Sequence, residues 1–427
     1  MSTRILARLF CLITAGSFLA AGCAPSQSVD EDPALDDGKG DGVWRPIDAD
    51  ESPSLLVNRA SKRLSTNISL DDVGQTYGTP DDAVPYPDTY WPYNDPTNQG
   101  ESNEPIVNSI DDRWSGHDQS PLERYMALTS PGDTEAAKAW QLANHGKNAP
   151  NVAPWFGLCN GWTGSALSEK PVRNGVDVKL VSGTPVVCDP GSEGCVHFDL
   201  GDINGLLAEA YLSADSDFLG ARCDLKPSEV QRDQYGRITS PGCQGANAGS
   251  LMIVAHVFMK NRKIGFAVNA QEPDATNEIW NQPAYRYSID SYDALTEEEA
   301  ARLVSGGRAT SYGEFNADAK GWVRVHATFS WVTENGPNEE YVDGTESTMR
   351  TVFDMVIELD KEVSDVAHPG TANIIGGEYL DANGGNRLNN FPYLWVPKGI
   401  GPDSGGDNNP YLKPSLIRQI ADLARSS

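Results

Sequence analysis

The spacing of apolar residues along the chain predicts several helices. Within residues 201–211, apolar side chains recur three and four positions apart, which places them on one face of a helix. Another helix is expected to open at Cys159, and another to follow the Ser-Pro start at Pro121. Two more are expected over 135–143, which is rich in helix formers, and after Pro414.

Apolar runs that continue or alternate predict strands in the second half of the chain. The run 251–258 is followed by a short polar stretch and then by the run 264–268, which together predict an antiparallel hairpin. Further strands are expected over 322–331, 351–359 and 374–379. Helices in one part and strands in the other predict an α+β fold.

The N-terminus has the pattern of an export signal over residues 1–22. Arg4 and Arg8 precede an apolar run that is too short to span a bilayer comfortably, and small residues follow it. Cys23 directly after them resembles a bacterial lipoprotein signal, in which the thiol is lipidated and holds the protein at the outer membrane or cell surface. Ordinary signal cleavage, which gives a soluble secreted product, is the alternative.

The rest of the chain divides into four parts. Residues 23–49 are acidic, contain Pro and Gly, and predict a flexible spacer. Residues 50–148 form an irregular and helical region with an aromatic-proline cluster, and residues 149–300 form the globular core. Residues 301–427 are expected to be rich in strands and to end in a helix.

The composition and the absence of several motifs argue against some classes of partner and of activity. The net charge of −27 argues against nucleic acid. No P-loop, HExxH or GxSxG pattern occurs, so nucleotide, zincin and serine-hydrolase functions have no support. No EF-hand spacing occurs either, and nothing in the sequence requires a cofactor.

The cysteine count singles out one thiol. Removal of the signal takes Cys11, and Cys23 has the lipid assignment. In an oxidising compartment the simplest pairing of the close cysteines joins Cys188 to Cys195 and Cys223 to Cys243, although the sequence allows other connectivities. Cys159 is left over. An odd thiol in an exported protein is a reactive nucleophile or an intermolecular link. The alternative is a buried cysteine that is unreactive and serves only packing.

The neighbours of Cys159 favour a nucleophile. At the start of a helix, the helix dipole and the unbonded backbone N–H groups favour a thiolate and could hold an oxyanion. Gly157 and Gly161 would let a substrate backbone approach, and Trp155 and Trp162 would form the walls of the site.

A thiol nucleophile needs a base and a group that orients the base. In the predicted hairpin, His256 of the first strand lies opposite Asn269 of the second, which predicts a triad of Cys159, His256 and Asn269. Asp274 is the alternative orienting residue. A lone histidine in an apolar run is more often a satisfied core residue.

Several short segments resemble the elicitor-type transglutaminases, secreted by oomycete plant pathogens and with relatives in bacteria. The most distinctive is Trp280-Asn281-Gln282-Pro283, and Trp280 is expected at the wall of the site. Other resembling segments lie, in the same order as in the family, at 86–92, 120–125, 155–162, 375–379 and 392–397. The resemblance implies a papain-like catalytic core and calcium-dependent cross-linking of protein glutamine to lysine or other amines.

One departure from the family pattern bears on the base. The family carries a histidine shortly after the glycine that matches Gly249, whereas this chain has Met252 there and its nearest histidine is His256. Three interpretations are open: His256 substitutes in a shifted register, the match to the family is out of register at Gly249, or the base is missing and the protein is a non-catalytic surface-binding relative. A papain-like peptidase or amidase is a further alternative, because the same triad cleaves peptide bonds.

Overall fold

The computed structural model describes residues 52–56, 72–93, 109–363, 372–380 and 390–427, apart from residues 115, 151, 154, 224, 227, 241 and 271–277. The predicted signal peptide, Cys23 and the acidic spacer lie outside the described residues, as does Asp274. Among the described residues, no helix has the length and apolar character needed to cross a membrane.

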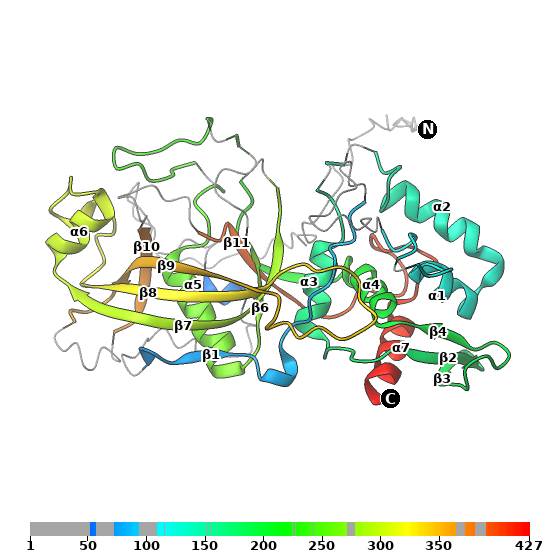
Figure 1. Ribbon diagram of the computed structural model, residues 1–427. Coiled ribbons are helices and arrows are strands. Elements are labelled where there is room, and N and C mark those ends of the chain that lie inside the picture. The colour runs from blue at the N-terminus through cyan, green and yellow to red at the C-terminus, as the bar shows by residue number, and fades with distance from the viewer. Residues whose placement is uncertain are drawn as a thin grey trace, which may run out of the picture.

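A large antiparallel sheet forms one half of the molecule (Figure 1). Its strand order is β10-β9-β8-β7-β6-β11-β5, and β1 pairs with β7. The long strands are β7 (Asn281–Leu295), β8 (Gly321–Val332) and β9 (Thr348–Leu359). The shorter ones are β1 (Thr76–Gly78), β5 (Ser216–Gly220), β6 (Phe266–Asn269), β10 (Ile374–Leu380) and β11 (Tyr393–Pro397). The sheet therefore joins strands from both sides of residue 300.

Helices gather at the other end of the molecule, beside a small sheet of order β3-β2-β4 (Figure 1). These helices are α1 (Pro121–Thr129), α2 (Thr134–Asn144), α4 (Leu200–Tyr211) and α7 (Pro414–Ser426). The small sheet contains β2 (Val176–Val181), β3 (Thr184–Val187) and β4 (Val196–Phe198). Ser120 and Glu123 form a capping box that starts α1, which explains why the Ser-Pro signal marks this helix.

Helix α3 (Cys159–Ser168) lies at the junction of the two halves, where it packs against both α4 and β7 (Figure 1). Its Trp162 belongs to the apolar core of the helical half. Cys159, by contrast, packs with Ala267 of β6 and with two aromatic residues of β11. The first residue of α3 therefore faces the large sheet.

Helix α5 (Ala248–Ala255) covers one face of the large sheet, and a π-helix, His256–Arg262, continues it. Helix α6 (Glu297–Ser305) packs at the far end of the sheet. Short 3₁₀ turns occur at Pro53–Leu55, Asp81–Ala83, Pro131–Asp133 and Tyr312–Glu314.

Most predicted elements are confirmed, and the molecule has the expected α+β fold. Helices α1, α2, α3, α4 and α7 and strands β8, β9 and β10 occur where the sequence predicts them. The hairpin prediction is wrong, because residues 251–258 are helical. A short continuous apolar run suits a buried helix as well as a buried strand, so periodicity alone cannot separate them. The deciding signal is Asn247, whose side chain accepts a hydrogen bond from Gly249 N and caps α5.

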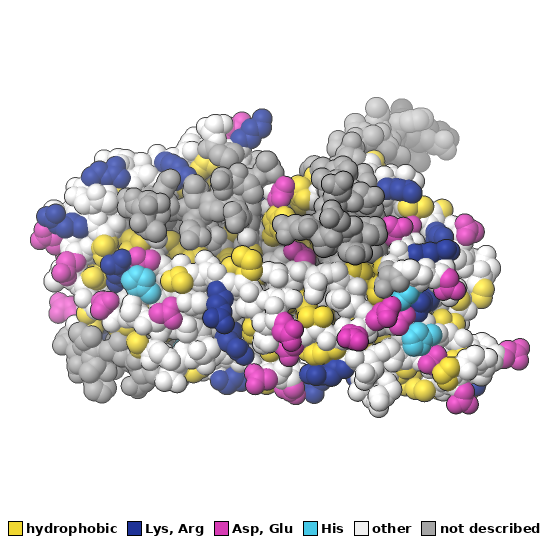
Figure 2. Space-filling view, in the orientation of Figure 1, with side chains coloured by type: hydrophobic (Ala, Val, Ile, Leu, Met, Phe, Trp, Pro, Cys, Tyr) yellow, Lys and Arg dark blue, Asp and Glu magenta, His cyan; other side chains and the backbone are white. Residues whose placement is uncertain are grey.

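Acidic side chains are scattered over both halves of the face shown in Figure 2, with basic side chains between them. This face carries charges of both signs in spite of the net charge of −27.

Candidate functional site

Cys159 lies at the first position of α3 and is 2% exposed. The preceding residue, Leu158, donates its backbone N–H to Tyr90 O over 2.6 Å, which fixes the start of the helix against the N-terminal segment. A Cβ at Gly157 would lie 2.5 Å from the same carbonyl oxygen, so only glycine fits this crossing. Gly157 therefore admits the protein's own backbone rather than a substrate backbone, which corrects the sequence-based expectation.

Gly161 serves helix packing in the same way. A Cβ at this position would lie 1.9 Å from Ala208 O of α4. The absence of a side chain lets α3 lie close against α4, and this contact sets the position of the thiol two residues earlier in the helix. The expected role of Gly161 in admitting substrate is therefore also wrong.

The sulfur of Cys159 lies beside the side chain of Asn281, the first residue of β7. Asn281 Nδ2 donates to Sγ over 3.5 Å, and the thiol donates to Ile279 O over 3.9 Å. Thr163 of α3 donates its hydroxyl to Asn281 O over 2.8 Å, which ties the cysteine helix to β7. The contact between Cys159 and Asn281 is therefore supported by a second bond between the same two elements.

Aromatic side chains surround this contact. Tyr393 and Trp395 of β11 pack with Cys159, and Tyr90, Trp155 and Phe218 pack against the same cluster. The predicted wall residue Trp155 is thus at the site. Such an enclosure lowers the local dielectric and strengthens the polar contacts inside it.

Of the other two predicted wall residues, one borders the site and one does not. The ring of Trp280 lies 6.4 Å from that of Tyr90, which itself packs against the cysteine cluster, so Trp280 borders the site. Trp162 does not, because it is fully buried in the helical half and donates its indole N–H to Tyr86 O.

Asn269 reaches the neighbourhood of the thiol from β6. It pairs with Asn281 in the register of β6 and β7, and its Oδ1 accepts the backbone N–H of Trp280 over 3.0 Å. Asn269 is therefore near the cysteine, but opposite Asn281 rather than opposite His256.

His256 lies on the other face of the sheet from Cys159. Phe266 and Val268 of β6 share an apolar cluster with Val257 and Phe258 next to His256, whereas Ala267 packs with Cys159. Successive side chains of a strand point to opposite faces. The sheet therefore separates the imidazole from the thiol, and the structure does not bring the predicted triad together.

The surroundings of His256 confirm this separation. Its Nδ1 lies 3.8 Å from Asp72 Oδ2, and Asp72 also accepts hydrogen bonds from Lys260 and Tyr77. The ring of Tyr77 lies 5.7 Å from that of Tyr287. Tyr287 is six positions along β7 from Asn281, a span of about 20 Å in an extended strand. Burial lowers the pKa of His256, and Lys260 lowers it further against the opposing effect of Asp72.

The remaining described histidines also have partners elsewhere. None of the five histidines in the described part of the chain forms a hydrogen bond or ion pair with Cys159. Besides His256 with Asp72, their acidic partners are Asp199 and Glu339 for His117, Glu209 for His145, Asp177 and Asp199 for His197, and Asp354 for His326. His368 lies outside the described residues.

One cluster of metal-ligating side chains occurs in the described ranges, formed by His117, Asp199 and Asp202. A cation already lies there, because Arg124 Nη1 is 2.8 Å from Asp199 and 2.9 Å from Asp202. Calcium takes six to eight oxygen ligands, so an imidazole and two carboxylates that share an arginine do not fit it.

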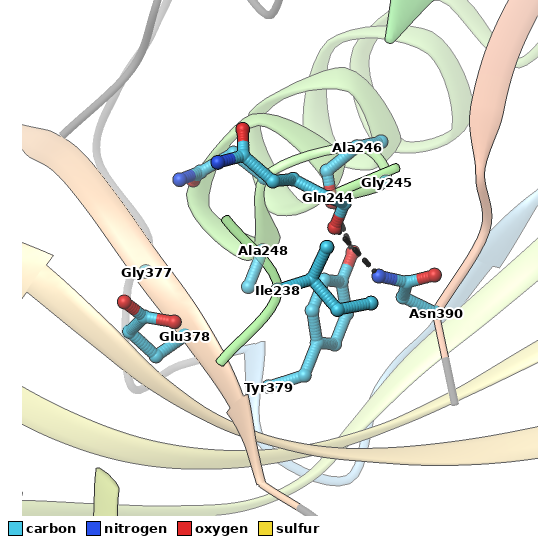
Figure 3. A pocket seen from close by; sticks show the side chains of 10 residues that line it. Ile238, Gln244, Gly245, Ala246, Ala248, Gly377, Glu378, Tyr379 and Asn390 are labelled. Carbon is cyan, nitrogen blue, oxygen red and sulfur yellow. Dashed lines mark hydrogen bonds between the residues drawn. The ribbon is translucent and has the colours of Figure 1, made fainter. Parts of the chain in front are cut away.

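A small pocket opens at the start of α5, away from Cys159 (Figure 3). Asn390 donates its amide to Gln244 O, and Tyr379 donates its hydroxyl to Ala246 O, so both side chains hold the loop that leads into the helix. The carboxylate of Glu378 in the wall pairs with Arg237. These contacts make the pocket part of the support for α5.

The two predicted disulfides are present, Cys188–Cys195 and Cys223–Cys243. Among the cysteines that the structure describes, Cys159 is the one that forms no disulfide, as the cysteine count predicts. The residue at the thiol that sequence reasoning missed is Asn281. Its signal was available, because it lies within the most distinctive motif, but its contact with Cys159 depends on the register of β7.

Fold and site together define a protein with a buried thiol at a helix start, packed against an antiparallel sheet. The family model for the transglutaminase elicitor matches residues 129–406, and the chain belongs to this family. The structure is similar to the crystal structure of the GP42 transglutaminase from Phytophthora sojae, with a TM-score of 0.56 and 17% sequence identity. That match covers 84% of this chain and 94% of the other. A comparison with curated proteins finds no match.

Proposed function

We propose that the protein transfers the side-chain acyl group of protein glutamine to lysine or another primary amine, through a thioester at Cys159. The observation that carries this proposal is the thiol at the first position of α3, with the amide of Asn281 donating to its sulfur. Membership of the transglutaminase elicitor family supports the same class of reaction.

The reaction balances without an external oxidant or reductant. The Cys159 thiolate attacks the carboxamide carbon of glutamine, the carbon–nitrogen bond breaks, and the nitrogen takes up one proton and leaves as ammonia. The amine then attacks the thioester, gives up one proton, and forms the isopeptide bond as the thiolate departs. Water in place of the amine would give deamidation. The separation of His256 from the thiol removes it from these proton transfers.

The surroundings of the thiol suit this chemistry in two ways. The first backbone N–H groups of a helix have no partner within the helix and favour negative charge, both on sulfur and on the oxygen of a tetrahedral intermediate. The aromatic residues Tyr90, Trp155 and Trp395 enclose the cysteine. Exclusion of water by these rings favours transfer to an amine over hydrolysis.

Export belongs to the same proposal. Two disulfides are consistent with an oxidising compartment outside the cytosol. We place the protein at the cell surface, held by a lipid on Cys23, or secreted. Its proposed partners are surface or extracellular proteins that present glutamine and lysine, and the membrane when the anchor is present.

A second candidate function is non-catalytic binding. The specific observation in its favour is that the structure places the sheet between Cys159 and the predicted base His256. In this alternative the aromatic enclosure binds a partner, and the thiol has no turnover.

Incorporation of a labelled primary amine into casein tests the proposal. We expect the wild type to incorporate label and Cys159→Ala to lose at least about a thousandfold in rate, because the nucleophile is gone. His256→Gln is the matched control and should retain activity within about threefold. Wild-type incorporation that persists in Cys159→Ala contradicts the proposal, complete absence of incorporation in the wild type favours binding, and a shortened casein chain indicates a peptidase.

A further inference from the structure

The orientation of the Asn281 side chain is determined by its neighbours. Trp395 Nε1 lies 2.9 Å from one end of the carboxamide, and an indole N–H can only donate a hydrogen bond. That end must therefore be the oxygen. The hydroxyl of Tyr393 donates to the same oxygen over 3.2 Å. The nitrogen is consequently the end that faces Cys159 Sγ, over 3.5 Å.

The backbone of Asn281 is held as firmly as its side chain. The residue is fully buried, its carbonyl accepts the Thr163 hydroxyl, and β6 fixes its register through Asn269. Contacts from α3, β6 and β11 therefore all converge on one residue, Asn281. Rotation that would turn the nitrogen away from the sulfur would break both bonds to the oxygen.

We propose that Asn281 is a catalytic residue whose Nδ2–H group donates to the Cys159 thiolate and holds it in the ionised form. Its catalytic importance rests on the proposed acyl transfer, whereas its effect on the thiol does not. A carboxamide nitrogen donates at every pH, and a hydrogen bond to an anion is stronger than one to a neutral thiol. The bond therefore favours the thiolate over the thiol.

The pH midpoint of thiolate formation tests this assignment directly. Thiolate absorbs in the ultraviolet, and the difference between full-length wild type and Cys159→Ala isolates Cys159 even though it is buried. In Asn281→Asp an oxygen replaces the donor at nearly constant shape, and the midpoint should rise by about one to two pH units. Asn281→Ala should raise it less, because the donor is lost without an added acceptor.

Tyr393→Phe provides a second variant that does not touch the sulfur. It removes one of the two donors to Asn281 Oδ1 and leaves Trp395 in place. The midpoint should rise by about half a pH unit, because the carboxamide is held less firmly. His256→Gln, on the far face of the sheet, should leave the midpoint unchanged.

An unchanged midpoint in folded Asn281→Asp overturns the assignment, with folding checked by near-ultraviolet circular dichroism. If that variant does not fold, an unchanged midpoint in Tyr393→Phe overturns it instead. The result is separable from the fate of the proposed function. If the protein transfers amine but the pH midpoint does not depend on Asn281, only this inference is rejected. If the midpoint depends on Asn281 but the protein transfers no amine, only the proposed acyl transfer is rejected.

Discussion

Strands β6 and β7 have a thiol on one face and an imidazole on the other, and the two faces satisfy their polar groups differently. On the first face, two donors fix the oxygen of Asn281 and direct its nitrogen at Cys159. On the second, the facing atoms His256 Nδ1 and Asp72 Oδ2 both lack a hydrogen bond within the described residues. The first face is organised around one sulfur atom, whereas the second has the looser contacts of a buried core histidine.

The difference between the two faces shows that the presence and order of suitable residues in the sequence do not establish that they lie together in a catalytic triad. The chain contains a cysteine, a histidine and an asparagine in the order of a papain-like triad. Only the cysteine and the asparagine Asn269 reach the same face of the sheet. Because α5 and the π-helix after it replace the predicted strand, His256 lies on the other face.

The largest expected effect on stability concerns the helix that positions the thiol. Gly161→Ala places a Cβ 1.9 Å from Ala208 O, so α3 and α4 must separate. We expect a loss of about 3 kcal/mol in the free energy of unfolding, measured with urea, and reduced amine incorporation as Cys159 moves.

Gly164→Ala on the same helix is the matched control for this loss. A Cβ there meets Tyr211 at 3.4 Å, an ordinary contact, so the helix should become about 0.5 kcal/mol more stable or remain unchanged. Equal losses in the two variants would show that the close approach of α3 to α4 does not control the position of the thiol.

A smaller effect is expected on the imidazole face. Because burial lowers the pKa of His256 in the folded state, folding favours the neutral ring. That contribution is complete above the unfolded pKa of about 6.5 and is lost as the pH falls through the lower folded value. His256→Gln should therefore reduce the loss of stability between pH 7.5 and pH 5 by less than about 1 kcal/mol.

Urea unfolding at the two pH values measures this change. The thiol midpoint and amine incorporation should be unaffected in the same variant, since the sheet lies between the two groups. A parallel fall in incorporation would mean that the two faces are coupled after all.

Much of the fold follows from local signals in the sequence. The Ser-Pro capping box predicts α1, the apolar spacing of residues 201–211 predicts α4, and short cysteine separations predict the disulfides. The helix start at Cys159 is also predicted correctly. These features depend on neighbours in the chain, so a single sequence contains them.

The composition of the site depends on distant neighbours. Asn281 faces the sulfur because β7 pairs with β6 at Asn269 and because β11, more than a hundred residues later, brings Trp395 to it. No local sequence pattern predicts this contact between distant residues. The misplacement of His256 has the same origin, since a short apolar run does not reveal whether it becomes a strand or a helix.

The acyl-enzyme itself is the most direct test of the central claim that Cys159 is the nucleophile. A glutamine-containing peptide would be incubated with the protein in the absence of amine, quenched in acid, and examined by intact mass spectrometry and peptide mapping. The account predicts an adduct on Cys159 equal to the peptide minus ammonia, present also in His256→Gln. Amine incorporation by the wild type without any adduct on Cys159 would contradict it.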